Sequence, residues 1–530
     1  MVFNSRRSTV MARKGMVATS QPLASMAGLR MMMEGGNAID AAVASAAVLN
    51  VVEPASTGVG GDVFALVWMA KDKKVVALNA SGRSGAASSA DELTSQGLTA
   101  ISSDSAYSVT VPGAVSGWDE IVSRFGKMPL SRVLEPAIEY ASVGFPVSEI
   151  ISGQWANNAH KLQRFPSGGE LLKDGRAPRA GEVMKMPELA ETMRTIAEGG
   201  AEAFYKGRLG ERIAAYVRER GGWLTAEDMA SHLPTLEEPI STEYRGVTVW
   251  QCPPNSQGVN TLMALNLVEG FDVKHMGFQT ADTYHHLIES VRLALTDGMH
   301  HVTDPARMNV ATEDLISKAY AEERRKLIRP DSVMDPAPVG WPQPKCDTVY
   351  LTCVDGEGNA CSFINSVYMG FGCGLVVPGT GIVLHSRGAS FSLDAERPNF
   401  LEPNKRPFHT LIPGMATKQG ELWLSYGVMG TVQQAQGQMQ VLVNMIDFGL
   451  SPQAAVDAPR FSVRLGEGIG IEDIVPEAVI GDLRARGHEL VVREPHPLFF
   501  GGGQIIERDA ETGVLKAGSE PRNDGFAVGW

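Results

Sequence analysis

The hydrophobic pattern is most informative two-thirds of the way along the chain. A proline-rich loop, residues 336–344, fits neither a helix nor a central strand, and at Thr348 it gives way to β-branched and aromatic residues typical of a buried strand. The sequence Asp-Gly-Glu-Gly-Asn at 355–359 predicts a turn, and a second strand follows over about 360–367. In a hairpin centred on this turn the numbers of paired residues sum to about 714, so we expect Ser366 to lie opposite Thr348.

Elsewhere the pattern alternates between helices and strands. Residues 21–52 have helical spacing interrupted by a glycine pair, and residues 63–79 have the pattern of a strand hairpin. Residues 112–330 are mostly helical in pattern. A second hairpin is expected within 409–426, and a helix should follow from about Gln433.

The two hydroxyls at the start of the first hairpin have two interpretations. They can be polar side chains on one face of an ordinary hairpin. Alternatively, the bond between Asp347 and Thr348 is cut, and the free α-amine, which titrates at about 7.7–8.0, takes the proton of the threonine hydroxyl. Backbone N–H groups of the turn at 427–431, just before the helix expected from Gln433, would then supply the donors that an oxyanion hole needs.

Composition narrows the classes of function. The net charge of −13 argues against nucleic acid or an anionic membrane as a partner, and no apolar run is long enough for a membrane helix. The first nine residues contain a basic pair without an apolar segment behind it, so we expect a cytoplasmic protein. The five cysteines lack metal-ligand spacing, and Cys353 and Cys361, which the hairpin register puts opposite each other, are expected to be small core residues.

Two patterns that could indicate a cofactor fail on spacing. Gly58, Gly60 and Gly61 precede a strand rather than a helix, unlike a nucleotide-binding fingerprint. His285 and Glu289 stand four residues apart on a predicted helix, but no third metal ligand follows at a usual distance. We therefore expect no cofactor and no metal.

Short motifs occur in order along nearly the whole chain, at residues 35–43, 52–62, 111–118, 222–228, 403–407, 457–461 and 521–525. Together with the segment around Asp347 and Thr348, their order and spacing resemble the γ-glutamyltransferase (γ-glutamyltranspeptidase) family of N-terminal-nucleophile hydrolases. Any one of these motifs is weak, but the set is specific.

The resemblance implies an α+β fold, a four-layer αββα sandwich. It also implies a precursor that cleaves itself into a large subunit, 1–347, and a small subunit, 348–530, which form one intertwined unit. By the same resemblance Thr348 is the nucleophile, Ser366 is its hydrogen-bonding partner, and Gly430 with Thr431 supplies the oxyanion donors. The family has a glycine pair at the last two positions, so Thr431 keeps the donor but restricts φ. Well-known members are exported, which makes the expected cytoplasmic location a departure.

The acyl pocket departs from the family pattern. Where the transpeptidases have an arginine that binds the α-carboxylate of the γ-glutamyl group, this chain has Ser81, and Arg83 on the same strand face is the candidate replacement. Ser390 stands in place of the acidic residue that holds the glutamyl amino group, with Asp394 as a possible substitute. The polar loop 385–397 is expected to line the pocket. Three further pocket positions also differ from the family pattern: Tyr368, His409 and Thr410.

Three hypotheses about function follow. The first is a self-processing enzyme that cleaves γ-glutamyl amides such as glutathione and transfers the acyl group to water or an amine. The second is an amidohydrolase or acylase of the same family acting on another short acid amide, oxamate-like or glutaryl-type. The third is an unprocessed, non-catalytic homologue that serves as a binding protein. The expected partners are a small amide and an acceptor amine or water, and association of processed units into a homo-oligomer stays open.

Overall fold

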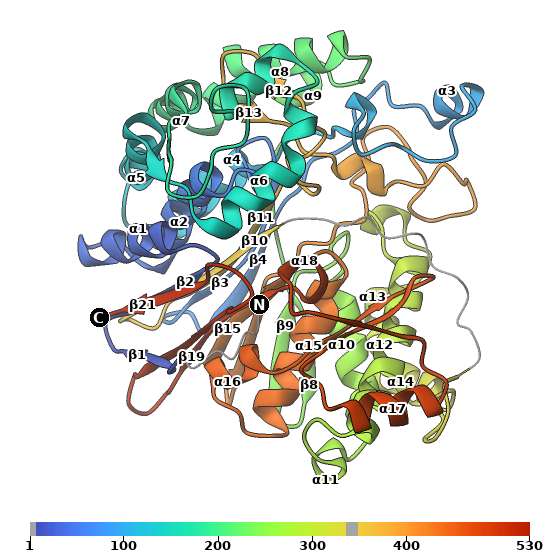
Figure 1. Cartoon of the computed structure of the whole chain (residues 1–530). Coiled ribbons are helices and arrows are strands. Elements are labelled where there is room, and N and C mark those ends of the chain that lie inside the picture. Colours follow the sequence, from blue (N-terminus) through green and yellow to red (C-terminus); the bar gives the residue numbers. More distant parts are fainter. Residues whose placement is uncertain (1–6, 335–347) are drawn as a thin grey trace.

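The computed structural model describes residues 7–334 and 348–530 and is built around two stacked sheets (Figure 1). Sheet A has the strand order β1 (Val10–Ala12), β20 (Leu515–Ser519), β19 (Gly502–Arg508), β15 (Glu421–Met429), β14 (Gly414–Lys418), β9 (Val247–Gln251) and β8 (Ile240–Tyr244). Sheet B has the order β21 (Phe526–Gly529), β2 (Gly15–Thr19), β10 (Val349–Asp355), β11 (Ala360–Ser366), β3 (Asp62–Met69), β4 (Lys74–Ala80) and β7 (Thr235–Glu237). All neighbouring strands in both sheets are antiparallel.

Alternation along the strands explains why both faces of each sheet are covered. In β3, Val63 and Ala65 belong to the core beneath the helices, whereas Phe64 and Leu66 belong to the core between the two sheets. Successive side chains of a strand point to opposite faces, so a strand that is apolar at every position must be buried on both sides. Met415 of β14 meets the same inter-sheet core from the other sheet.

Helices cover the outer face of each sheet (Figure 1). Sheet B is covered by α1 (Pro22–Met33), α2 (Ala38–Val52), α4 (Ala114–Phe125), α5 (Leu130–Val143) and α7 (Pro187–Tyr205). Sheet A is covered by α10 (Gly258–Val268), α12 (Ala281–His301), α15 (Gln433–Ile446) and α16 (Pro452–Asp457). The αββα sandwich expected from the resemblance is therefore confirmed.

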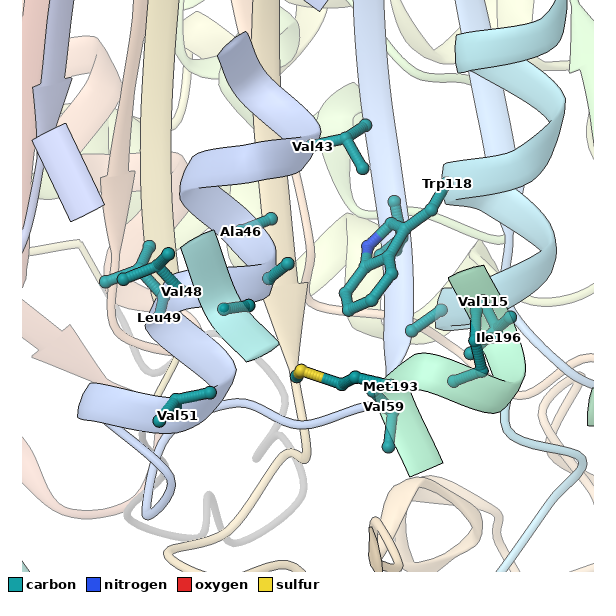
Figure 2. Close-up of a cluster of buried hydrophobic side chains, with 14 of the residues drawn as sticks. Val43, Ala46, Val48, Leu49, Val51, Val59, Val115, Trp118, Met193 and Ile196 are labelled. Atoms are coloured by element: carbon teal, nitrogen blue, oxygen red, sulfur yellow. The ribbon is translucent and has the colours of Figure 1, made fainter. Parts of the chain in front are cut away.

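The alanine-rich helix α2 is buried along its whole length. Its small side chains let it pack closely against neighbouring elements, and Figure 2 shows Val43, Ala46 and Leu49 in the same cluster as Trp118 of α4 and Met193 of α7. The helix begins with a capping box between Asn37 and Asp40, directly after the glycine pair at residues 35–36.

Residues 112–330 are mostly helical, as predicted, and also contain the strands β7, β8 and β9 and two strands of two residues each. One predicted boundary was wrong. The second hairpin starts at Gly414 rather than His409, because the backbone of His409 is already hydrogen-bonded to Asn255 and Gln257, at 2.9 Å each.

Further elements complete the fold: α3 (Ala90–Ser95), η1 (Ala106–Ser108), β5 (Phe145–Pro146), α6 (Glu149–Leu162), η2 (Pro166–Leu171), β6 (Val183–Met184), α8 (Arg208–Glu219), α9 (Ala226–Ala230), α11 (Val273–Met276), η3 (Pro305–Arg307), α13 (Thr312–Leu315), α14 (Lys318–Arg325), β12 (Val376–Val377), β13 (Ile382–Val383), η4 (Arg387–Ser390), β16 (Phe461–Arg464), β17 (Gly468–Glu472), α17 (Glu477–Ala485), β18 (Leu490–Arg493) and α18 (Pro497–Phe500). Within residues 7–334 and 348–530, no helix has both the length and the apolar character to cross a membrane.

Candidate active site

Thr348 and Ser366 face each other at one end of the β10–β11 hairpin. The observed register pairs Val349 with Asn365 and Cys353 with Cys361, so the predicted sum of about 714 is confirmed. The Thr348 Oγ1 and Ser366 Oγ atoms are 3.1 Å apart, and both residues are buried. Asp347, the other half of the predicted cleavage site, lies outside the described residues, so cleavage itself stays a prediction.

Further bonds hold this pair in place. The backbone N–H of Tyr368 donates to Ser366 Oγ at 2.8 Å, and Tyr368 has a left-handed φ of 76°. On the strand that begins after Thr348, the Thr352 hydroxyl bonds to that of Ser425, which ties β10 to β15 of the other sheet. The nucleophile candidate therefore lies directly before a strand that is fixed from two sides.

Gly430 and Thr431 form a turn between β15 and α15. Both have left-handed backbones, with φ of 115° and 52°. For a β-branched residue such as Thr431 this conformation is costly, as the sequence comparison with a glycine pair predicts. Gln257 at the start of α10 joins this turn to the pocket, because its Nε2 donates to the carbonyls of Thr431 at 2.8 Å and Thr410 at 2.9 Å.

A buried carboxylate lies next to the hydroxyl pair. Asp62, the first residue of β3, pairs with Ser366 in the sheet register. Its Oδ1 accepts the N–H groups of Gly82 and Gly113, both at 3.2 Å, and its Oδ2 accepts the Nε2–H of His409 at 3.1 Å. Sequence reasoning gave Asp62 no role, although the residue lies inside one of the quoted motifs.

The hydrogen bonds of His385 and His409 fix both rings as neutral imidazoles with the proton on Nε2. His385 Nε2 donates to the Thr110 carbonyl at 3.0 Å, and its Nδ1 accepts the N–H of Arg387 at 3.1 Å. His409 Nδ1 accepts the N–H of Leu411 at 3.3 Å while its Nε2 donates to the Asp62 carboxylate.

The electrostatics agree with this assignment. Burial, reinforced by the positive charge of Arg387, lowers the pKa of His409 to about 3 despite the nearby carboxylate, and burial likewise lowers the pKa of His385. Burial opposes ionisation of Asp62, but the hydrogen bond from His409 and the positive charge of Arg387 hold its pKa well below the usual range. The cluster thus contains one carboxylate, two neutral imidazoles and one guanidinium at neutral pH.

Arg387 is the pocket residue that sequence reasoning missed. It opens η4 within the predicted polar loop and is 1% exposed. Its guanidinium lies 4.0 Å from the centre of the Tyr368 ring, and its Nη1 donates to Thr410 Oγ1 at 2.9 Å. The signal in the sequence was an arginine inside a loop expected to line the pocket. The sequence alone does not distinguish a buried arginine at this position from a solvated one.

Two other residues predicted to line the pocket, Arg83 and Ser390, make different contacts. Arg83 is about half exposed, and its Nη1 bonds to Asp304 at 2.8 Å and to the Asn404 carbonyl at 3.0 Å. Ser390 donates to a backbone carbonyl, that of Arg387 or Phe408, and thus offers a hydroxyl rather than a charge. Their roles in substrate binding stay predictions.

Asp394 and the two helix residues weighed as metal ligands also lie outside this cluster. Asp394 is exposed and stands 3.7 Å from Arg397. His285 bonds to His488 and to the Arg329 carbonyl, and Glu289 pairs with Arg292 at 2.7 Å. Across the described parts of the chain, no group of three or more potential ligands is arranged to hold a metal ion.

The chain is similar along nearly its whole length to several known proteins. The crystal structure of a cephalosporin acylase from Bacillus halodurans superposes with a TM-score of 0.95 and 45% identity, covering 100% of this chain and 98% of the other. A glutathione hydrolase-like YwrD proenzyme of Bacillus subtilis is 38% identical over 98% of this chain and 99% of its own length. An acylase ACY 1 proenzyme of Pseudomonas sp. strain SE83 is 36% identical over 99% and 95%, respectively. The family model described as gamma-glutamyltranspeptidase matches residues 24–530, and this chain belongs to that family of enzymes.

Proposed function

We propose that this protein is a self-processing amide hydrolase or acyltransferase whose nucleophile is Thr348. The observation that carries the proposal is the buried contact of 3.1 Å between Thr348 Oγ1 and Ser366 Oγ, directly before the first residue of β10. The relatives named as proenzymes support processing of a precursor, because they are similar along nearly their whole length. A non-catalytic role is disfavoured by a hydroxyl pair positioned in this way.

Processing would begin when the Thr348 hydroxyl attacks the carbonyl of Asp347. The peptide C–N bond breaks as the C–O bond forms, so an ester replaces the amide and the nitrogen of Thr348 becomes an amine. Water then hydrolyses the ester, leaving a carboxylate on Asp347 and a free hydroxyl and amine on Thr348. Every strand and helix described before 335 would belong to the large subunit.

The two subunits would remain intertwined after the cut. Sheet B combines β2, β3, β4 and β7 from before the linker with β10, β11 and β21 from after it. Sheet A likewise combines β1, β8 and β9 with β14, β15, β19 and β20. Separation of the subunits would therefore break both sheets.

In turnover the same hydroxyl would attack a substrate amide, with the α-amine of Thr348 as proton acceptor. This amine titrates near neutral pH, at about 7.7–8.0 when unperturbed, which suits a general base. We assign the N–H groups of Gly430 and Thr431 to the oxyanion, and Ser366 to orientation of the nucleophile. The acyl group would then pass to water or to an amine, releasing the second product.

Two classes of acyl donor fit the proposal. A γ-glutamyl amide is favoured by the similarity to a protein named glutathione hydrolase-like. An amide of another short acid is favoured by the similarity to proteins named acylases, and by Ser390 in place of an acidic residue.

Denaturing electrophoresis with mass spectrometry tests the proposal, together with 4-nitroaniline release from γ-glutamyl and glutaryl anilides. We expect two chains, beginning at Met1 or its processed terminus and at Thr348, and turnover of at least one anilide. Thr348→Ala should remain one chain and be inactive, whereas Thr348→Ser, which keeps both hydroxyl and amine, should still be processed. A full-length Thr348→Ala chain that turns over anilide at the wild-type rate would refute the proposal.

A further inference from the structure

Tyr350 reaches from the strand next to the nucleophile to the opposite sheet. It follows Thr348 by two positions, and because side chains two positions apart along an extended chain share a face, both face sheet A. The Tyr350 side chain is fully buried in the core between the two sheets. Its ring lies against the backbone of Gly427 in β15, since a Cβ at that glycine would be 2.4 Å from Tyr350 Cε2. The strand of the nucleophile therefore contacts the strand that leads into the Gly430–Thr431 turn.

The Tyr350 hydroxyl connects the same two sheets through a hydrogen bond. Ser362 Oγ lies 2.7 Å from this hydroxyl, accepts the N–H of Gly414 at 3.0 Å and donates to the Tyr426 carbonyl at 3.3 Å. Because the single proton of Ser362 is used on that carbonyl, the Tyr350 hydroxyl is the donor of the bond between them. Burial raises the pKa of the phenol well above its usual value, so the donor keeps its proton. Gly414 and Tyr426 are paired in the register of β14 and β15, so one serine joins Tyr350 to two strands of sheet A.

Two contacts define how β10 and β15 pass each other between the sheets. Tyr350 meets Gly427, and two positions further along β10 the Thr352 hydroxyl bonds to that of Ser425. The residue numbers in each of these pairs sum to 777, so the two strands run in opposite directions. Strands of packed sheets stay within about 30° of each other, which lets this register be extended by two residues. The extension puts the nucleophile opposite Met429, the last residue of β15, directly before the oxyanion turn.

We propose that Tyr350 is a positioning residue that fixes the distance between the Thr348 hydroxyl and the oxyanion donors. The inference rests on the amide-hydrolase function proposed above, and Tyr350 itself contacts no reacting atom. The hydroxyl and the donors belong to different sheets, and they must be placed within about 0.5 Å of the productive geometry to stabilise the developing negative charge. A buried ring with a hydrogen-bonded end maintains this spacing, because a shift of either sheet would press the ring on Gly427 or stretch the bond to Ser362.

Tyr350→Phe keeps the ring and removes the hydrogen bond to Ser362. With the anilide that the wild-type enzyme cleaves faster, γ-glutamyl or glutaryl, we expect kcat of the processed variant to fall about tenfold or more. KM should stay unchanged, because oxyanion donors act in the transition state and not in substrate binding. An unchanged kcat, or a rise in KM alone, would overturn the proposal.

The matched control is Tyr244→Phe on β8. Tyr244 is as deeply buried as Tyr350, and its hydroxyl donates a hydrogen bond of the same length, 2.7 Å, to Asp447. Its side chain belongs to the core beneath the helices that cover sheet A and not to the core between the sheets. Tyr244→Phe should therefore match wild type in kcat and KM. An equal fall of kcat in the two variants would assign the effect to a lost buried bond in general and contradict the proposal.

Gly427→Ala changes the spacing from the other sheet. Its methyl group would lie 2.4 Å from the Tyr350 ring, so the ring must move, and we expect kcat to fall about 100-fold. Tyr350→Leu makes room for that methyl group, so adding Gly427→Ala to the Tyr350→Leu protein should lower kcat by less than about threefold. An equal effect of Gly427→Ala in the two proteins would show that the ring does not transmit the shift, which contradicts the proposal.

Processing gives a second readout, because the same hydroxyl must attack the Asp347 carbonyl before turnover begins. If Tyr350→Phe stays full-length, its urea unfolding is compared with that of Tyr244→Phe, both carrying Thr348→Ala. A Tyr350→Phe chain as stable as this control supports the proposal, and a much less stable one assigns Tyr350 to folding and contradicts it. The two proposals also fail in different ways. A wild-type chain that stays full-length and cleaves neither anilide contradicts the proposed function. A processed and active wild-type enzyme whose kcat is matched by Tyr350→Phe and Gly427→Ala contradicts only the role of Tyr350.

Discussion

The substitution His409→Gln gives a prediction whose size follows from the structure. Glutamine can keep a side-chain N–H directed at Asp62 but does not titrate. Burial, with a contribution from Arg387, lowers the pKa of His409 to about 3 in the folded protein, whereas an unfolded histidine titrates at about 6.5. Between these values the unfolded chain binds a proton that the folded chain does not, so acid destabilises the fold.

Each pH unit in this window changes the free energy of unfolding by up to about 1.4 kcal/mol. Between pH 7.5 and pH 5, the wild-type residue should therefore lose about 2 kcal/mol more stability than glutamine at the same position. Above pH 7.5 the histidine is neutral in both states, and its contribution no longer depends on pH. The carboxylate of Asp62 stays ionised throughout this range because its pKa is held low.

Urea unfolding of an unprocessed single chain measures the difference. Both proteins carry Thr348→Ala, so that processing does not separate the chain, and each is unfolded at pH 7.5 and pH 5. Other buried histidines with a lowered pKa, such as His232 and His488, titrate in both proteins and cancel in the comparison. An equal loss of stability in the two proteins would show that His409 is protonated in the folded state, which would refute the neutral cluster.

Three further substitutions test the hydroxyl pair and two backbone positions. Ser366→Ala removes the partner of Thr348 and the acceptor for the Tyr368 N–H, so kcat on an anilide should fall about tenfold or more. An unchanged kcat would contradict the role of Ser366. Thr431→Gly relieves a left-handed backbone and should raise the free energy of unfolding by about 1 kcal/mol, a gain that Thr431→Ala should not match. Gly82→Ala would place a methyl group 1.6 Å from the Val111 carbonyl oxygen, so it should lower the free energy of unfolding in urea by about 3 kcal/mol. Gly481→Ala is the control, because Gly481 has open space around it and the substitution should not lower this free energy.

Local signals in the sequence predicted the hairpin and its register well. The turn at 355–359 and the β-branched residues beside it are enough to fix a register, because a one-residue slip would turn every side chain to the wrong face. The capped start of α2 at Asn37 follows from the same kind of local signal. The family motifs then supplied the layer arrangement that these local signals do not contain.

The pocket was predicted less well because its contacts join distant parts of the chain. Asp62 and His409 are 347 positions apart, and nothing near either residue indicates that they meet. Arg387 is a single cation in a polar loop, and only its burial against Tyr368 distinguishes it from a surface residue. The strands β8 and β9 were missed because each has only five residues and lies inside a long region of helical spacing.

Mass spectrometry of the active, purified protein tests the central claim most directly. We expect a small chain whose first residue is Thr348 with a free α-amine, and amide turnover that disappears when this amine is chemically blocked. A peptide that still joins residues 347 and 348 in fully active protein would contradict the assignment of Thr348 as an N-terminal nucleophile.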